Sequence, residues 1–311
     1  MFQLEMAKFI NFKSNIKHLP KRIILIRHGQ SSANLDRNVY ANTPDHKIPL
    51  TPHGIDQARE AGRKLLDLAN NISDHGNPPN CSSNAYFYVS PYERAKSTLR
   101  EIIRAFPRHR VVGVREECRL REKDYGCFQH KSESVDPMAG WDKIEEDCEK
   151  YGRFFYRFPN GESGADVYNS VSSFVETLWR DIDMKRLYND PSSVELNVVI
   201  VSHEETILIF LMRWFHWSTE QFESLKGPKN CEIRVLELGS SGEYSLAVQH
   251  DDETMKEWGL SDEMIEDQNQ RAIAKPREYV SNEKNPRYLN SFFDSIDTDD
   301  GSHQQDADQN N

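Results

Sequence analysis

Short apolar runs alternate with longer amphipathic segments along most of the chain. Runs of β-branched and aromatic side chains that are apolar at every position predict strands buried on both faces, as in a parallel sheet. Such runs predict strands at residues 22–27 and 196–201, and further strands are predicted at residues 85–89, 111–114, 232–238 and 244–248.

The segments between these runs have helical spacing. Residues 55–68 place apolar side chains on one face, and Thr51 followed by Pro52 is typical of a helix start. Ser90 and Glu93 fit a capping box that opens a second helix after the 85–89 strand.

Two more helices are predicted, at residues 165–179 and from the 196–201 strand to about Trp217. The alternation of strands and helices predicts a three-layer α/β/α sandwich with a mainly parallel sheet. Residues 120–161 are rich in charge and aromatic side chains but poor in periodicity, which predicts a helical insertion or lid.

The two ends of the chain differ from the rest, so the domain is predicted at residues 20–270. Residues 1–19 are mildly basic and predict a flexible leader. A transit peptide is the alternative, disfavoured by Glu5 and by the lack of arginine. Residues 271–311 lose the apolar pattern and become rich in aspartate, which predicts a disordered acidic tail.

Composition narrows the classes of function. The 39 basic and 50 acidic residues give a net charge of −11, which argues against a nucleic-acid or anionic-membrane surface. No apolar run approaches the roughly 20 residues that cross a bilayer. The 5 cysteines are scattered without a zinc-ligand spacing. Reduced thiols and a cytoplasmic location are therefore expected, with the nucleus or an organelle as alternatives.

Polar side chains collect where the predicted strands end. Arg27 and His28 follow the first strand, Arg94 lies one turn into the helix after the second, and Ser202 and His203 follow the 196–201 strand. Ligands of open α/β sheets bind at the carboxyl ends of strands. A single strand-end arginine or histidine is usually structural, but this set together predicts a site for a dianion such as phosphate.

These residues carry a family resemblance. Arg27 to Ser31, with Asn34, resembles the RHGxSxxN signature of the histidine phosphatase superfamily, the phosphoglycerate mutase-like proteins. The run RFFYRFPNGES at residues 153–163 is similar to plant and fungal phosphoglycerate mutase-like proteins of the broad-range acid phosphatase type. Further segments follow in the family's order: LTPHG at 50–54, SPYERA at 90–95, LREKDYG at 120–126, PNGES at 159–163 and VSH at 201–203.

The resemblance implies a metal-independent phosphatase of small phosphorylated metabolites, with no cofactor. His28 would form a phosphohistidine, Glu122 would be the general acid and base, and His203 would be the second catalytic histidine. The phosphate would be bound by Arg27, Ser31, Asn34, Arg94 and Ser202. At the entrance we place three residues of the aromatic and basic segments: Tyr125, Arg153 and Arg157.

One position departs from the family pattern. Glu204 follows the second histidine, where the family usually has glycine. Its carboxylate could turn toward a basic residue of a neighbouring loop, act as a proton donor with a raised pKa, or impair the pocket. A zinc HExxH motif is disfavoured because position 207 is Ile207.

Three functions stay open from the sequence. A phosphomonoesterase is favoured by the six motifs in order. A catalytically weakened member that binds or regulates is the alternative, motivated by Glu204 and the acidic tail. A phosphoglycerate mutase is less favoured, because YGCFQHKS at residues 125–132 lacks the family's YGxLxGxxK substrate segment.

Overall fold

The computed structural model describes residues 19–70, 83–126, 141–188, 195–240 and 242–273. The predicted leader (1–19) and acidic tail (271–311) lie almost wholly outside these ranges. The last helix continues to Ile273, three residues past the predicted end of the domain.

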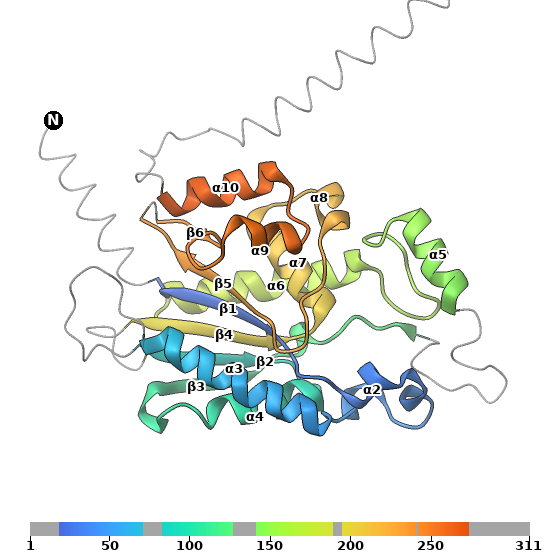
Figure 1. Ribbon diagram of the computed structural model, residues 1–311, viewed down its shortest axis with the longest axis horizontal. Helices are drawn as coiled ribbons and strands as arrows, with labels where there is room; N and C mark the ends of the chain where they lie inside the picture. The colour runs from blue at the N-terminus through green and yellow to red at the C-terminus, as the bar shows by residue number, and fades with distance from the viewer. Residues whose placement is uncertain (1–18, 71–82, 127–140, 189–194, 241, 274–311) are drawn as a thin grey trace, which may run out of the picture. The chain divides into compact units, whose positions relative to one another are not determined.

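The described strands form one mixed sheet in the order β3-β2-β4-β1-β5-β6 (Figure 1). The first four are mutually parallel, β5 pairs antiparallel with β1, and β6 pairs antiparallel with β5. This arrangement confirms the predicted sheet. The strands are β1 (Arg22–Arg27), β2 (Asn84–Val89), β3 (Val111–Glu116), β4 (Leu196–Ser202), β5 (Ile233–Leu238) and β6 (Tyr244–Ser245).

The strand predicted at 244–248 is wrong in length. It stops at Ser245, whose hydroxyl donates to the Gln268 carbonyl. The chain then turns, because the amides of Gln249 and His250 both bond the Leu246 carbonyl. Strand β3 is longer than predicted and ends at Glu116.

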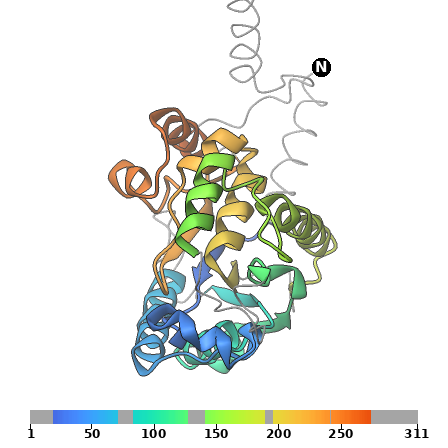
Figure 2. The same cartoon turned by 90° about the vertical axis from the view of Figure 1, so that its right-hand side faces the viewer.

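Helices cover both faces of the sheet, which makes the three-layer sandwich (Figures 1 and 2). Helices α3 and α4 cover one face, and α6 to α10 lie on the other. The longer helices are α3 (Pro52–Asn70), α4 (Glu93–Ile103), α5 (Trp141–Tyr151), α6 (Gly164–Asp183), α7 (Glu204–Phe215) and α10 (Asp262–Ile273). The shorter ones are α2 (Ser32–Leu35), η1 (Arg37–Ala41), η2 (Asp45–Lys47), η3 (Arg108–Arg110), η4 (Cys118–Leu120), α8 (Thr219–Ser224) and α9 (Asp252–Glu257).

Strands β1, β2 and β4 are buried on both faces, as their apolar runs predict, whereas the edge strand β3 is half-buried to exposed. On β1, Ile23 and Leu25 belong to the core under α6 and α7, whereas Ile24 and Ile26 belong to the core under α3 and α4. Alternate side chains of a strand point to opposite faces, so a strand between two helical layers needs apolar residues throughout.

One predicted helix cap is confirmed and another is wrong. Thr51 Oγ1 accepts a hydrogen bond from the Gly54 amide at 3.0 Å, at the start of α3. Helix α4 instead begins at Glu93 after an N-cap at Tyr92, without a side-chain cap. The hydroxyl of Ser90 is held in the site described below, so it is not part of a capping box with Glu93.

The register of the parallel strands β1, β2 and β4 aligns their carboxyl ends. Arg27 of β1 lies opposite Ser202 of β4, and Val89 of β2 lies opposite Val201. The amide of His28 donates to the Ser202 carbonyl at 3.0 Å. The residues that follow β1, β2 and β4 therefore emerge side by side.

The predicted insertion at 120–161 contains one described helix, α5, and its residues 127–140 lie outside the described ranges. Helix α5 lies beyond the carboxyl ends of the strands (Figure 1). Among the described helices, none combines the length and hydropathy that a bilayer span requires.

Candidate active site

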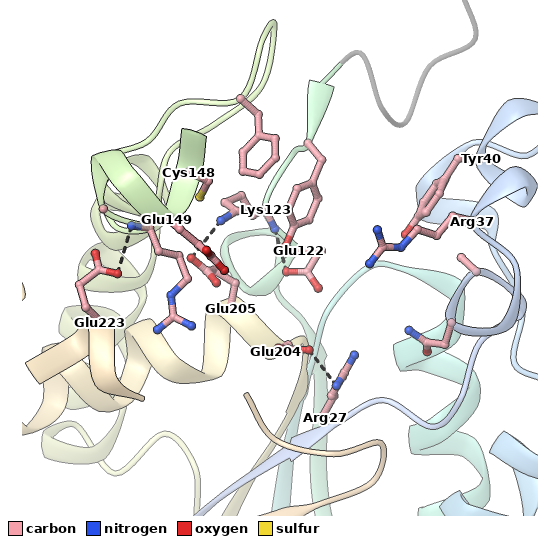
Figure 3. Close-up of a pocket in the computed structure, with 16 residues that line it drawn as sticks. Arg27, Arg37, Tyr40, Glu122, Lys123, Cys148, Glu149, Glu204, Glu205 and Glu223 are labelled. Carbon is pink, nitrogen blue, oxygen red and sulfur yellow. Dashed lines mark hydrogen bonds and ion pairs between the residues drawn. The ribbon is translucent and has the colours of Figure 1, made fainter. Parts of the chain in front are cut away.

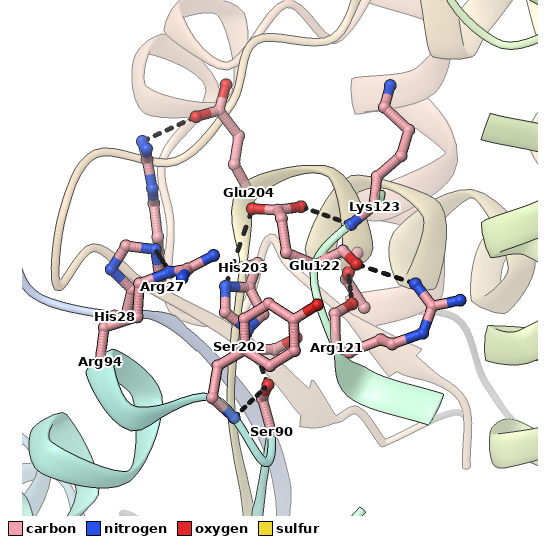
Figure 4. Close-up of polar contacts among 12 residues, drawn as sticks. Arg27, His28, Ser90, Arg94, Arg121, Glu122, Lys123, Ser202, His203 and Glu204 are labelled. Atoms are coloured by element: carbon pink, nitrogen blue, oxygen red, sulfur yellow. Dashed lines mark hydrogen bonds and ion pairs between the residues drawn. The ribbon is translucent and has the colours of Figure 1, made fainter. Parts of the chain in front are cut away.

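Two histidines and a glutamate meet at the carboxyl ends of β1 and β4 (Figure 4). The rings of His28 and His203 pack edge to face with centroids 5.1 Å apart. A carboxylate oxygen of Glu122 and one nitrogen of each ring lie within 4.8 Å of one another, and all three residues are buried. The structure thus brings together three side chains that are far apart in the sequence.

The hydrogen bonds of His28 determine its tautomer. Nδ1 lies 2.7 Å from the Gly29 carbonyl, which can only accept, so Nδ1 carries the proton. Nε2 accepts from Nε of Arg94 at 3.2 Å and is therefore the nitrogen that carries the lone pair. Burial, and then the charge of Arg94, holds the pKa of His28 well below 6.5, which keeps the ring neutral.

The two ring nitrogens of His203 have different surroundings. Its Nε2 lies 2.7 Å from the hydroxyl of Ser90, which also accepts from the Tyr92 amide. Ser90 Oγ can donate to Nε2 or accept from it, and in the tautomer in which Ser90 donates, Nδ1 carries the proton. Burial, followed by the charge of Arg94, keeps the pKa of His203 well below 6.5. Among the described residues Nδ1 has no hydrogen-bond partner.

Arg94 is fixed on both sides. Its Nη1 donates to the carbonyl and the carboxylate of Asp45, each at 2.8 Å, while its Nε faces His28. The Arg94 guanidinium also lies 4.9 Å from the centre of the Tyr92 ring. A buried arginine held in this way keeps its charge at a fixed point beside the His28 ring.

Arg27 lies at the mouth of the site. Its Nη1 donates to the Pro228 carbonyl at 2.7 Å and pairs with Glu204 Oε2 at 2.8 Å. Its Nε is buried and has no hydrogen-bond partner among the described residues. Glu204 does turn toward an arginine, but the partner is the predicted phosphate ligand itself rather than a residue of a neighbouring loop.

Glu122 is suited to hold a proton near neutral pH. Burial raises its pKa to about 7, although the charge of Arg94 and the Lys123 amide oppose this shift. Its Oε1 accepts from the Lys123 amide at 3.0 Å, and Oε2 lies 3.7 Å from Nδ1 of His203. A carboxyl group of this pKa can both donate and accept a proton at physiological pH.

The loop that carries Glu122 is held at several points. Arg121 forms a two-pronged ion pair with Glu162, and Glu162 also accepts from the Asp124 amide at 2.9 Å. The Ser202 hydroxyl donates to the Leu120 carbonyl at 2.8 Å. The prediction that Ser202 binds phosphate is therefore not supported, because its proton is used to hold this loop.

Ser31 and Asn34 form a small amide network beside the centre. Asn34 Oδ1 accepts from the amide and the hydroxyl of Ser31, at 2.9 and 3.1 Å. Asn230 donates to the same oxygen at 3.3 Å and to the His28 carbonyl at 3.1 Å. Asn34 also lines the cavity above the centre, while Ser31 is buried and does not line it.

A cavity of about 730 Å³ opens above the buried centre (Figure 3). Arg27, Asn34, Glu122 and Glu204 line it, whereas His28, Arg94 and His203 do not. Its wall also contains the buried ion pair between Lys123 and Glu205, with Nζ and Oε1 3.0 Å apart. The other lining residues are Ala33, Arg37, Tyr40, Tyr125, Cys148, Glu149, Gly152, Arg153, Phe158 and Glu223.

Two of the three predicted entrance residues line this cavity. Tyr125 and Arg153 do, although the guanidinium of Arg153 donates to the carbonyls of Phe222 and Leu225. Arg157 does not. It is exposed and bonds Asp166 at 2.7 Å, and its place at the entrance stays a prediction.

The cluster of His28, Glu122 and His203 has the residue types of a metal site, but its surroundings suit an anion. Arg94 lies 3.2 Å from Nε2 of His28 and Arg27 lies close by, so a bound cation would face two guanidinium groups. Arg27 Nε is a buried donor without a hydrogen-bond partner among the described residues, and it needs an acceptor rather than a metal ion.

Sequence reasoning missed Asp45, Tyr92 and Asn230. Nothing in the local pattern around Asp45 distinguishes it from an ordinary loop aspartate, and its role depends on contact with Arg94, which is 49 residues away. Tyr92 packs on His203 with ring centroids 5.1 Å apart. Its position inside the SPYERA segment was the one signal available.

Comparison with known proteins agrees with the geometry. The sequence model of the histidine phosphatase superfamily (branch 1) matches residues 23–251. The chain is 55% identical to the phosphoglycerate mutase-like protein AT74 of Arabidopsis thaliana, over 90% of this chain and 84% of that protein. It is 30% identical to a broad-range acid phosphatase of Saccharomyces cerevisiae, over 71% of this chain and 86% of that one.

Solved structures share the fold. A mycobacterial glucosyl-3-phosphoglycerate phosphatase bound to VO₃ superposes with a TM-score of 0.52 at 19% identity, covering 70% of this chain and 91% of that one. The predicted resemblance to plant and fungal relatives is thus confirmed, and the relatives include phosphatases. The chain belongs to the histidine phosphatase superfamily.

Proposed function

We propose that this chain is a phosphomonoester hydrolase that works through a phosphohistidine on Nε2 of His28. The observation that carries the proposal is that a nitrogen lone pair and unsatisfied hydrogen-bond donors lie together at the buried centre. Nε2 of His28 carries a lone pair, while Arg27 Nε and, in the tautomer in which Ser90 donates to Nε2, His203 Nδ1 are donors without partners among the described residues. A nucleophile beside unsatisfied donors matches the needs of phosphoryl transfer.

In the first step Nε2 attacks phosphorus, and the bond from phosphorus to the ester oxygen breaks. Arg94 moves its Nε bond from His28 to a phosphoryl oxygen, and Arg27 and His203 bind the other oxygens. Glu122 gives its proton to the departing alkoxide. In the second step Glu122 takes a proton from water, whose oxygen attacks phosphorus and displaces His28 as inorganic phosphate forms.

The trapped phosphoenzyme tests this proposal. The protein is mixed with a ³²P-labelled phosphomonoester and quenched in alkali, in which phosphohistidine survives. Wild type is expected to carry label that is lost in acid, and His28→Ala is expected to carry none. His109, exposed on η3, provides the matched control, so His109→Ala should label like wild type. Absence of both label and hydrolysis would overturn the proposal.

A second candidate is a weakened family member that binds phosphorylated compounds without turnover. The ion pair between Arg27 and Glu204 favours it, because a carboxylate already occupies part of the predicted phosphate site. Under this candidate inorganic phosphate would bind in calorimetry, while wild type would neither label nor hydrolyse any phosphomonoester. A mutase would instead return the phosphoryl group to a second hydroxyl rather than to water.

A further inference from the structure

Acidic side chains dominate one wall of the cavity above the proposed phosphate site. They are contributed by α5, α7 and α8, and they face Arg37 and Tyr40 of η1 on the opposite side (Figure 3). The four residues are Glu149, Glu204, Glu205 and Glu223.

These carboxylates differ in how far their charge is balanced. Glu205 is paired with Lys123 in a buried contact, so this pair adds no net charge. Glu223 accepts from the amides of Arg153 and Phe154, at 3.1 and 2.9 Å, and those amides carry no formal charge. The guanidinium of Arg153 is directed to backbone carbonyls instead. The cations Arg27, Lys123 and Arg153 thus stand against four carboxylates, so the wall keeps a small excess of negative charge.

Glu204 is the member of this wall next to the phosphate site. It follows His203 directly, and its Oε2 lies 2.8 Å from Nη1 of Arg27. Its side chain is 43% exposed, so the carboxylate stands at the boundary between the buried centre and the open cavity. Its charge reaches the centre, because it contributes to the raised pKa of Glu122.

The position of the Glu204 side chain is set by a glycine. The carboxylate and Cγ lie directly over Gly227, where a Cβ would overlap them. The next residue, Pro228, provides the carbonyl that holds Arg27. The Gly227–Pro228 segment thus places both members of the ion pair.

We propose that Glu204 is a specificity-determining residue that selects phosphomonoesters by the charge of their leaving group. It disfavours a second negative charge two or three atoms from the ester oxygen, and it favours an ammonium or hydroxyl group there. This inference rests on the proposed phosphatase function. When Arg27 binds the phosphoryl group, the leaving group of the substrate lies against Glu204. The carboxylate there repels a negatively charged group and accepts a hydrogen bond from an ammonium or hydroxyl group.

A size-matched series of esters tests the inference. The probes are 2-aminoethyl phosphate, 2-hydroxyethyl phosphate and carboxymethyl phosphate, which differ mainly in the charge of one terminal group. Wild type is expected to give the highest kcat/KM with the aminoethyl ester and the lowest with the carboxymethyl ester. In Glu204→Gln and Glu204→Ala the ratio between these two should fall by about tenfold, as expected when one charge near a partly exposed site is removed. Glu60→Gln, on the exposed surface of α3, is the control and should leave the ratio unchanged.

Two results would overturn the inference: an unchanged ratio in both Glu204 variants, or a wild-type preference for the carboxymethyl ester, which would assign selectivity to Arg37. Calorimetric binding of the same esters to His28→Ala separates this inference from the proposed function. If wild type proves inactive, the proposed function fails, yet the ratio of affinities with and without Glu204→Gln still decides whether Glu204 selects by charge.

Discussion

Nε of Arg94 donates to Nε2 of His28 across 3.2 Å. Because a guanidinium N–H can only donate, Nε2 is the ring nitrogen that carries the lone pair. The same contact lowers the pKa of His28 in addition to the effect of burial. Under the proposed mechanism the bound phosphoryl group would take this donor in place of His28, so the arginine would prepare the nucleophile in the free protein and stabilise charge during transfer.

Asp45 determines where Arg94 points, and its removal should weaken both stability and activity. Asp45→Ala leaves a buried guanidinium with fewer partners, so unfolding in urea should show a loss of about 3–5 kcal/mol. Asp45→Asn keeps one acceptor and should lose less. Asp56→Ala breaks an exposed pair with Arg59 and should cost under about 1 kcal/mol. Equal stability of Asp45→Ala and Asp56→Ala would contradict the role of Asp45.

The pH dependence of kcat/KM should report Glu122. Its pKa of about 7 means that the proton donor is present below that pH and is lost above it. The lowered pKa of His28 places loss of the nucleophile well below pH 6.5. The rate should therefore be highest on the acid side of neutrality and fall above about pH 7. Glu122→Gln should lower the rate by a factor of about 10²–10⁴ and remove the fall in kcat/KM above pH 7, the upper limb of the pH profile. A limb that persists in the variant would assign it to another group.

Glu162 is expected to be a positioning residue, since it holds Arg121 and the Asp124 amide on either side of Glu122. Glu162→Ala should lower kcat more than it raises KM, with the largest loss on esters whose alkoxide needs a proton. The upper pH limb should also shift, because Glu122 would gain access to water. Loss of stability without a shift of that limb would indicate a purely structural role.

Gly227→Ala should reproduce the effect of removing Glu204 without changing any charge. The new methyl group would meet the flexible end of Glu204 and displace it from Arg27. We expect the aminoethyl-to-carboxymethyl ratio of kcat/KM to fall in Gly227→Ala. In the Glu204→Ala background the same change should have no further effect on the ratio, which a double-mutant cycle measures. If the two substitutions change the ratio independently, Gly227 does not act through the ion pair between Glu204 and Arg27.

Much of the fold follows from local pattern. The buried strands appear as continuous apolar runs because a strand between two helical layers has no solvent-facing side. The last strand was overestimated, because the turn after Ser245 depends on contact with Gln268, which is distant in sequence. Helices α8, α9 and α10 were not predicted, as they are short or weakly patterned.

The candidate site divides in the same way. The sequence alone determined which side chains end the strands: Arg27, His28, Arg94 and His203 are polar residues at the ends of apolar runs or one turn into the next helix, and their order matches a family signature. Only the tertiary structure decided which groups the polar side chains at these strand ends contact. Ser90 and Ser202 were assigned to a helix cap and to phosphate, yet their hydroxyls hold His203 and the Glu122 loop.

Glu204 shows the division most clearly. Its identity in place of glycine is visible in the sequence, but the effect of a carboxylate depends on what lies within a few ångströms of it. The structure places it against Arg27 and over Gly227, residues that are 177 positions before it and 23 after it. Local pattern determines secondary structure because it depends on neighbours in the chain. Charge pairing depends on distance in space, and the packed fold alone sets that distance.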